Sequence, residues 1–250
     1  MVREAETTVA SGDADRQRAA WRALPKKLFV TLLALDTIFV AVYIALIALG
    51  RHKHELFVLF NLDKEANLPS WYAGTQLFIV AIGYLVLGSR LIPDRRKTSV
   101  LRPLWLLLGV GFTLLSADEI GAVHERMGHT LKHLKVFNFH YLDQWMVLYL
   151  AIALVLAIVF GRQLLTVWRE WRSEVLLFFL GFAVLAGGAI AAEMIHISRD
   201  MEGMRLLIEV GAEEWLEMFG VTILILPAYR ILAYAMGSKP GIDEEDVSGV

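Results

Sequence analysis

The chain has 250 residues, of which 57% are hydrophobic and only 20% are charged, and its mean hydropathy is +0.55. Soluble domains of this size are seldom so apolar, so the composition indicates a membrane protein and excludes an intrinsically disordered chain. The 24 basic and 26 acidic residues nearly balance, which excludes nucleic acid as a partner. Cysteine is absent, so disulfides and thiolate metal sites are excluded, and any metal would need nitrogen and oxygen ligands.

Long apolar stretches recur along the chain, separated by short polar connections. A transmembrane helix needs about 20 mostly apolar residues, and six stretches are close to that length. The sequence therefore predicts an all-α, polytopic six-transmembrane-helix bundle over residues 25–237. The expected spans are about 28–49, 68–89, 103–125, 142–161, 174–196 and 209–236. The flanking segments 1–24 and 238–250 are polar and are expected to be short disordered ends.

The distribution of positive charge predicts the orientation of the bundle. The segments on the side of the N-terminus together hold 16 Lys and Arg residues, against 8 on the opposite side. Cytoplasmic loops carry the excess of Lys and Arg in membrane proteins. We therefore expect both termini to be cytoplasmic, in a multi-pass protein of the plasma or inner membrane.

With this orientation, ionisable residues gather at the outer ends of three spans. The third and fifth spans end with carboxylates and imidazoles, and the sixth span begins with carboxylates. These residues are Asp118, Glu119, His124, Glu125, Glu193, His196, Glu209, Glu213, Glu214 and Glu217. Ionisable residues in membrane spans are costly, and they commonly mark functional sites.

Helical spacing predicts which of these side chains share a face. If the third span is one continuous helix, Asp118 and Glu125 lie on one stripe, and a continuation past Gly128 would add His129. Glu193 and His196 are i,i+3 neighbours. Carboxylates that face one another in an apolar bundle repel unless they are protonated, paired, hydrated or bridged by a cation. The pattern thus predicts an outward-facing cavity.

We hypothesise that this cavity binds a divalent metal, Fe, Mn or Zn, and acts on a lipid or another membrane-soluble substrate. The Glu-x-x-His pair resembles part of the ligand set of di-iron and di-manganese carboxylate bundles. The expected ligands are Asp118, Glu125, Glu193, His196, Glu213 and Glu217. Glu119 or His124 is the candidate general base or a partner that orients a ligand.

Two alternatives to an enzyme remain open. The same acidic vestibule would serve a proton- or cation-coupled transporter or channel, with a path that continues inward to Asp36. Such carriers commonly show internal repeats or broken helices in matching halves, and the sequence has neither. A structural or assembly protein without catalysis is the other alternative.

Asp36 is the most deeply placed charge in the chain. It lies about 12 Å beyond Leu28 along a helix, near the middle of the bilayer. It is either a proton relay or the partner of Arg230, which is expected near the inner end of the sixth span.

Small residues are frequent in two of the predicted spans. The fifth contains Gly181, Gly187 and Gly188, and the third contains Gly109 and Gly111. Small residues let helix backbones approach closely in membranes. We therefore expect these glycines to mark tight helix packing.

Three segments together resemble a family of uncharacterised bacterial multipass membrane proteins. The first is the loop Asn61-Leu62-Asp63-Lys64-Glu65, with Asn67, Pro69, Trp71 and Tyr72 after it. The second is Ser116-x-Asp118-Glu119-x4-His124-Glu125, and the third is Glu213-Glu214-x-x-Glu217-Met218. The resemblance spans most of the chain. It implies a bacterial membrane and carries no biochemical activity.

Overall fold

The computed structural model describes the backbone of residues 2–51, 54–64, 66–89, 91, 100–134, 144–198 and 204–237. Side chains are described for these residues except 2–14, 125, 129, 131–134, 144–146, 189–198 and 204–208. Throughout this part of the chain the regular structure is helical, which confirms the all-α prediction. The expected C-terminal tail, 238–250, lies outside the described residues.

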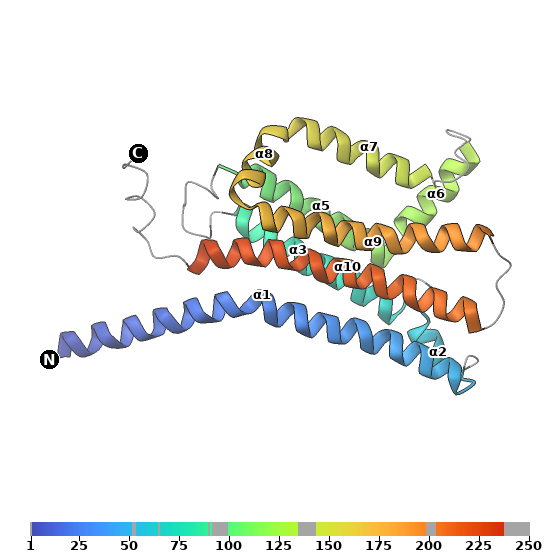
Figure 1. Cartoon of the computed structure of the whole chain (residues 1–250), viewed down its shortest axis with the longest axis horizontal. Coiled ribbons are helices and arrows are strands. Elements are labelled where there is room, and N and C mark those ends of the chain that lie inside the picture. The colour runs from blue at the N-terminus through green and yellow to red at the C-terminus, as the bar shows by residue number, and fades with distance from the viewer. Residues whose placement is uncertain are drawn as a thin grey trace.

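Long helices that share one axis make up the bundle, and short helices lie at its ends (Figure 1). The long helices are α1 (Val2–Ala48), α3 (Leu68–Gly88), α5 (Arg102–Gly121), α7 (Gln144–Val159), α9 (Arg172–Ser198) and α10 (Met204–Gly237). The short ones are α2 (Glu55–Phe60), α6 (Val123–Leu134) and α8 (Gly161–Glu170). The start of α1 and the end of α10 lie at the same end of the bundle (Figure 1).

The first helix is longer than the predicted first span. It begins at Val2 and therefore includes residues 2–24, which the sequence analysis expects to be disordered. The segment before Pro25 is rich in Ala and Arg, two residues with high helix propensity. Local propensity thus extends the apolar span at its N-terminal side.

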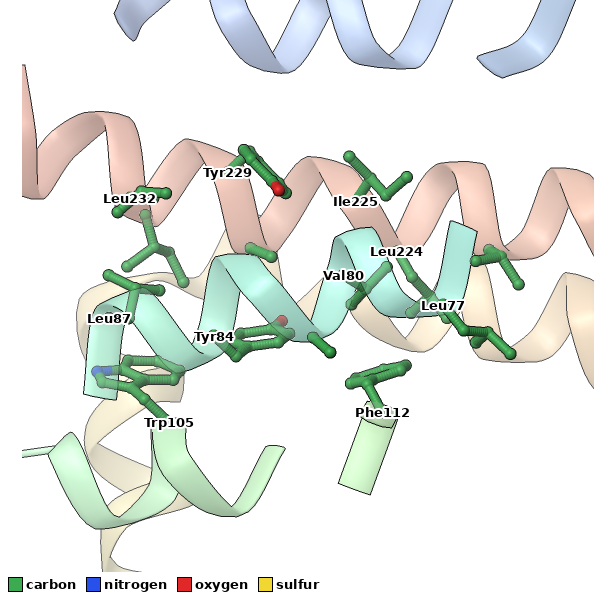
Figure 2. Close-up of a cluster of buried hydrophobic side chains, with 14 of the residues drawn as sticks. Leu77, Val80, Tyr84, Leu87, Trp105, Phe112, Leu224, Ile225, Tyr229 and Leu232 are labelled. Carbon is green, nitrogen blue, oxygen red and sulfur yellow. The ribbon is translucent and has the colours of Figure 1, made fainter. Parts of the chain in front are cut away.

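Helix α3 lies at the centre of the bundle and packs against both α5 and α10. Its buried side chains include Val80, Tyr84 and Leu87, none of them more than 2% exposed. Figure 2 shows Tyr84 on the α5 side of α3, between Trp105 and Phe112. The Tyr84 ring stacks on both Trp105 and Phe112, at centroid distances of 5.9 Å each. This aromatic column joins α3 to α5.

Four helices among the described residues are long and apolar enough to cross a membrane. They lie within Asp15–Ala48, Leu68–Gly88, Arg102–Gly121 and Glu209–Gly237. A fifth span results if α7 and α8 count as one, although the two are bent by 78° at their junction. The predicted span 174–196 coincides with α9, whose side chains are described only as far as Gly188. The structure therefore supports a multi-pass helical protein with four or five spans in its described part.

The glycine prediction is confirmed at several positions and not at others. A Cβ on Gly181 would lie 2.7 Å from the Leu224 side chain, and one on Gly109 would lie 2.6 Å from that of Leu85. A Cβ on Gly220 of α10 would lie 2.6 Å from the backbone nitrogen of Leu185. Open space surrounds the Cβ positions of Gly111 and Gly187. Close approach therefore explains α9–α10 packing at Gly181 and Gly220.

The prediction of one continuous third span is wrong at its outer end. Helix α5 ends at Gly121, Ala122 adopts a left-handed conformation (φ 48°, ψ 43°), and α6 starts at Val123. The Ala122 N–H donates to the carbonyl of Asp118, which closes α5. Asp118 and Glu125 therefore belong to different helices, and the predicted stripe through them does not exist.

Candidate functional site

The break between α5 and α6 brings Asp118 and His124 together. Asp118 Oδ1 accepts a 2.6 Å hydrogen bond from the His124 backbone N–H, and Oδ2 lies 3.3 Å from His124 Nδ1. The first amides of a helix have no partner within it, so Asp118 caps α6. Tyr149 of α7 donates its hydroxyl to Asp118 Oδ2 at 3.0 Å. One buried carboxylate thus joins three helices.

The conformation of Ala122 is unusual for a residue with a Cβ. The left-handed region costs an L-residue about 1–2 kcal/mol, and strain of this kind often occurs at functional sites. At Ala122 it lets the chain change direction between α5 and α6 within one residue (Figure 1). This change of direction brings the His124 backbone N–H of α6 to Asp118 and so creates the Asp118–His124 pair.

Glu119, Glu213 and Glu217 lie on the helices where the sequence predicts them, whereas Glu125 lies on α6. Glu119 follows Asp118 at the end of α5 and is half-buried, as are Glu213 and Glu217 on α10. A Cβ on Gly188 would lie 3.2 Å from the Glu213 carbonyl and 3.5 Å from Glu217 Cγ, so both residues are on the α9 side of α10. The predicted ligands whose side chains lie outside the described residues are Glu125, Glu193 and His196.

Asp118 of α5 and Gly188 of α9 lie at a similar depth, and Glu193 follows Gly188 by five residues, or about 7.5 Å, along α9. Phe112 of α5 contacts Phe182 of α9 at a centroid distance of 6.0 Å. The two helices run in the same direction (Figure 1). Asp118 and Gly188 each follow six residues later, so both lie about 9 Å further along the axis. Among the described side chains, however, no group of three or more His, Asp or Glu residues is close enough to hold a metal ion.

A second polar site lies deep between α1, α3 and α10. Asp36 is completely buried, and its carboxylate contacts three neutral side chains. Gln76 Nε2 lies 2.7 Å from Oδ1, the Tyr72 hydroxyl 2.7 Å from Oδ1, and the Thr222 hydroxyl 2.8 Å from Oδ2. We call Asp36, Tyr72, Gln76 and Thr222 the Asp36 cluster. Its hydrogen bonds link α1, α3 and α10 at one point.

The structure does not pair Asp36 with Arg230. Arg230 is exposed, and it lies eight residues, or about 12 Å, beyond Thr222 along α10. The contacts of Asp36 are all with neutral groups. Of the two alternatives for this acid, the ion pair is therefore wrong.

A family model matches residues 27–231, which is most of the chain and includes both polar sites. The chain belongs to the family described as a domain of unknown function (DUF8692). Searches of curated proteins and of solved structures gave no match. Membership of DUF8692 confirms the resemblance to an uncharacterised family.

Four residues of these sites were not identified from the sequence as site residues. They are Tyr149, Tyr72, Gln76 and Thr222. A signal exists for two of them, because Tyr72 and Gln76 are polar residues one helical turn apart inside a predicted apolar span. For Tyr149 and Thr222, single polar residues in apolar stretches, the sequence offers no comparable pattern.

Proposed function

We propose that this member of DUF8692 is a membrane-embedded, divalent-metal-dependent enzyme that acts on a lipid or another membrane-soluble substrate. In this proposal six helices cross the plasma or inner membrane of a bacterium, and both termini are cytoplasmic. The positive-inside charge distribution supports the orientation. The shared position of the start of α1 and the end of α10 agrees with an even number of spans (Figure 1).

The Asp118–His124 pair is the observation that carries the proposal. A carboxylate at Nδ1 fixes the orientation and tautomer of an imidazole and makes Nε2 the reactive nitrogen. The His124 side chain is 20% exposed and the Asp118 side chain 11%, so the pair lies at the edge of the apolar bundle. In this arrangement His124 accepts or delivers a proton at Nε2, or binds a metal there, while Asp118 orients the ring.

In this proposal the metal is bound near the Asp118–His124 pair by the carboxylates and the imidazole predicted from the sequence. They are Glu125, Glu193, His196, Glu213 and Glu217, with Glu119 as an alternative base. Carboxylate oxygens and imidazole nitrogens suit Fe, Mn and Zn. A bound divalent cation would supply positive charge that polarises a substrate oxygen. Asp118 was predicted to be a ligand, but its contacts with His124 and Tyr149 favour an orienting role.

The surface of α7 favours a substrate that arrives from the bilayer. Tyr149 links this helix to Asp118, and the neighbouring residues Leu148, Leu150 and Leu154 are 41%, 69% and 61% exposed. Exposed apolar side chains on a spanning helix face lipid. In this proposal the membrane-soluble substrate approaches the Asp118–His124 pair along the exposed apolar face of α7.

Metal analysis of the detergent-purified protein tests the proposal. We expect at least one tightly bound Fe, Mn or Zn ion per chain, measured by elemental mass spectrometry. Glu193→Ala and His196→Ala should each lose most of it, whereas Glu55→Ala, which removes an exposed acid of α2, should retain it. A wild-type protein without metal, or full retention in both variants, would contradict the proposal.

Flux measurements separate the enzyme from a transporter. A transporter in proteoliposomes would move protons or cations, and this flux would vanish in Asp36→Asn while it survived His196→Ala. The enzyme proposal predicts no such flux. A structural protein would tolerate Glu193→Ala and His196→Ala without change in any of these measurements.

A further inference from the structure

The Asp36 cluster is closed off from solvent. Asp36, Gln76 and Thr222 have no exposed surface, and Tyr72 is 5% exposed. The Phe39 ring stacks on Tyr72 at a centroid distance of 4.7 Å and covers its face. A carboxylate in such a place loses its hydration, and only hydrogen bonds or a counter-charge can offset that loss.

No positive charge contacts the cluster from the described helices packed around it. The titratable group that faces Asp36 from α3 is Tyr72, and the group that α10 presents is the neutral Thr222. Two acids lie near Tyr43, which is about two turns further along α1 than Asp36: Glu214 of α10 and Asp63 from the loop before α3. These acids are negative and cannot balance a charge on Asp36.

The cluster has too few hydrogens for the hydrogen-bond distances within it. Three short distances join Asp36 to Gln76, Tyr72 and Thr222. In addition, Gln76 Nε2 lies 2.9 Å from Thr222 Oγ1 and 3.1 Å from the Tyr72 hydroxyl. The Tyr72 hydroxyl is also 3.0 Å from the Leu32 carbonyl. Tyr72 and Thr222 each carry one hydroxyl hydrogen and Gln76 carries two amide hydrogens. With Asp36 ionised, four hydrogens serve six short distances and two distances are left without one; a proton on Asp36 leaves only one.

Gln76 provides a second sign of missing hydrogen. Its Oε1 atom is buried and has no hydrogen-bond partner, although Nε2 of the same amide contacts Asp36, Tyr72 and Thr222. Buried acceptors without partners are rare, and each calls for an explanation. The cluster therefore has more acceptors than its side chains can satisfy when Asp36 is ionised, and a proton on Asp36 reduces this excess by one donor, although none reaches Gln76 Oε1.

We propose that the Asp36 cluster is a proton-binding site, and that in this structure Asp36 carries the proton. A proton on Oδ1 is donated to the Tyr72 oxygen, which leaves the Tyr72 hydroxyl hydrogen for the Leu32 carbonyl. Thr222 donates to Oδ2, and Gln76 donates one amide hydrogen to Thr222 and shares the other between Tyr72 and Asp36 Oδ1. Every hydrogen of the cluster then has an acceptor, and the site is neutral.

The same side chains also accommodate release of the proton. When the proton leaves, the Tyr72 hydroxyl turns from the Leu32 carbonyl to Asp36 Oδ1, over distances of 3.0 and 2.7 Å. The second amide hydrogen of Gln76 then turns fully to Oδ1, and Thr222 keeps its hydrogen bond to Oδ2. Tyr72 is thus the positioning residue that switches with the protonation state. This site is independent of the proposed metal site, so either proposal can fail alone.

Infrared difference spectroscopy of the full chain in lipid nanodiscs at neutral pH tests the proposal. Subtracting the spectrum of Asp36→Asn from that of the wild type should reveal the C=O stretch of one protonated carboxylic acid, which shifts in D2O. Asn is close in shape to the protonated acid and should preserve the fold. Asp63→Asn, at an exposed acid, should remove only ionised carboxylate bands. Loss of carboxylate bands without an acid band in Asp36→Asn would overturn the proposal.

A second variant keeps the proposal testable if Asp36→Asn does not fold. Tyr72→Phe leaves the acid in place but removes the hydroxyl that accepts its proton. The acid C=O band should move to higher frequency, as it does when a carboxylic acid loses a hydrogen bond. Tyr84→Phe, at another buried tyrosine of α3, should leave the band unchanged. An identical band in Tyr72→Phe and the wild type would overturn the assignment of Tyr72.

Discussion

The two buried aspartates, Asp36 and Asp118, are held in opposite ways. Asp36 lies between the three helices α1, α3 and α10, far from their ends, and its side chain contacts only neutral groups. Asp118 lies at the end of α5, beside a left-handed residue, and contacts an imidazole that is 20% exposed. Hydrogen bonds to neutral groups hold Asp36 between its helices and offset the cost of its burial, whereas an acid that orients a histidine at a strained break is suited to chemistry at that histidine. The difference shows that burial alone does not identify the reactive carboxylate.

The largest effect is expected at the Asp36 cluster. Asp36→Leu removes the acceptor of Thr222 and Gln76 inside the bundle, and it should lower the free energy of unfolding by about 3 kcal/mol. Asp36→Asn should cost far less, because it keeps the polar contacts. Reversible unfolding in mixed detergent measures both. Equal stability of the Leu variant and the wild type would show that the cluster does not fasten the three helices.

A smaller loss is expected where α10 meets α9. Gly220 is two residues from Thr222 and lies at the interface with α9, so its packing supports both the Asp36 cluster and the contact between α9 and α10. Gly220→Ala places a methyl group against the backbone of α9 and should lower the free energy of unfolding by about 2 kcal/mol. Gly187→Ala is the matched control, because open space surrounds Gly187. Comparable unfolding curves for the two variants would exclude close approach at Gly220.

The capping role of Asp118 predicts a more local effect. Asp118→Ala should lower the free energy of unfolding by about 1 kcal/mol, the usual loss when a helix cap is removed. It should also speed amide hydrogen exchange in the first turn of α6. Exchange in α10 around Thr222 should not change. Mass spectrometry of exchanged peptides measures both regions. Faster exchange throughout the bundle would mean that Asp118 supports the whole fold, as Asp36 does.

The smallest effect is expected at the helix break. Ala122→Gly relieves the left-handed strain and should raise the free energy of unfolding by about 0.5 kcal/mol. Ala117→Gly, in the same helix at an exposed position, should lower it by about 1 kcal/mol. A loss in both variants would contradict a left-handed Ala122.

The long helices could be predicted from the sequence, whereas the contacts of the two aspartates could not. Apolar runs dictate helices because a membrane leaves no other partner for the backbone. The break at Ala122 was hidden, because alanine is a strong helix former and the residues around it continue the pattern. The partners of Asp36 come from positions 40 and 186 residues away in the chain, so only tertiary packing reveals them. The depth of Asp36 was predictable because the apolar residues on either side of it place it mid-span.

Convergence of the acidic helix ends is the central claim, and thiol chemistry tests it most directly. The chain has no cysteine, so introduced thiols report only on themselves. In the double variant Glu125→Cys, His196→Cys, we predict that Cd²⁺ bridges the two thiols and protects both from alkylation. The double variant Asp63→Cys, His196→Cys should show no protection. Full alkylation of the first pair in the presence of Cd²⁺ would contradict a shared site.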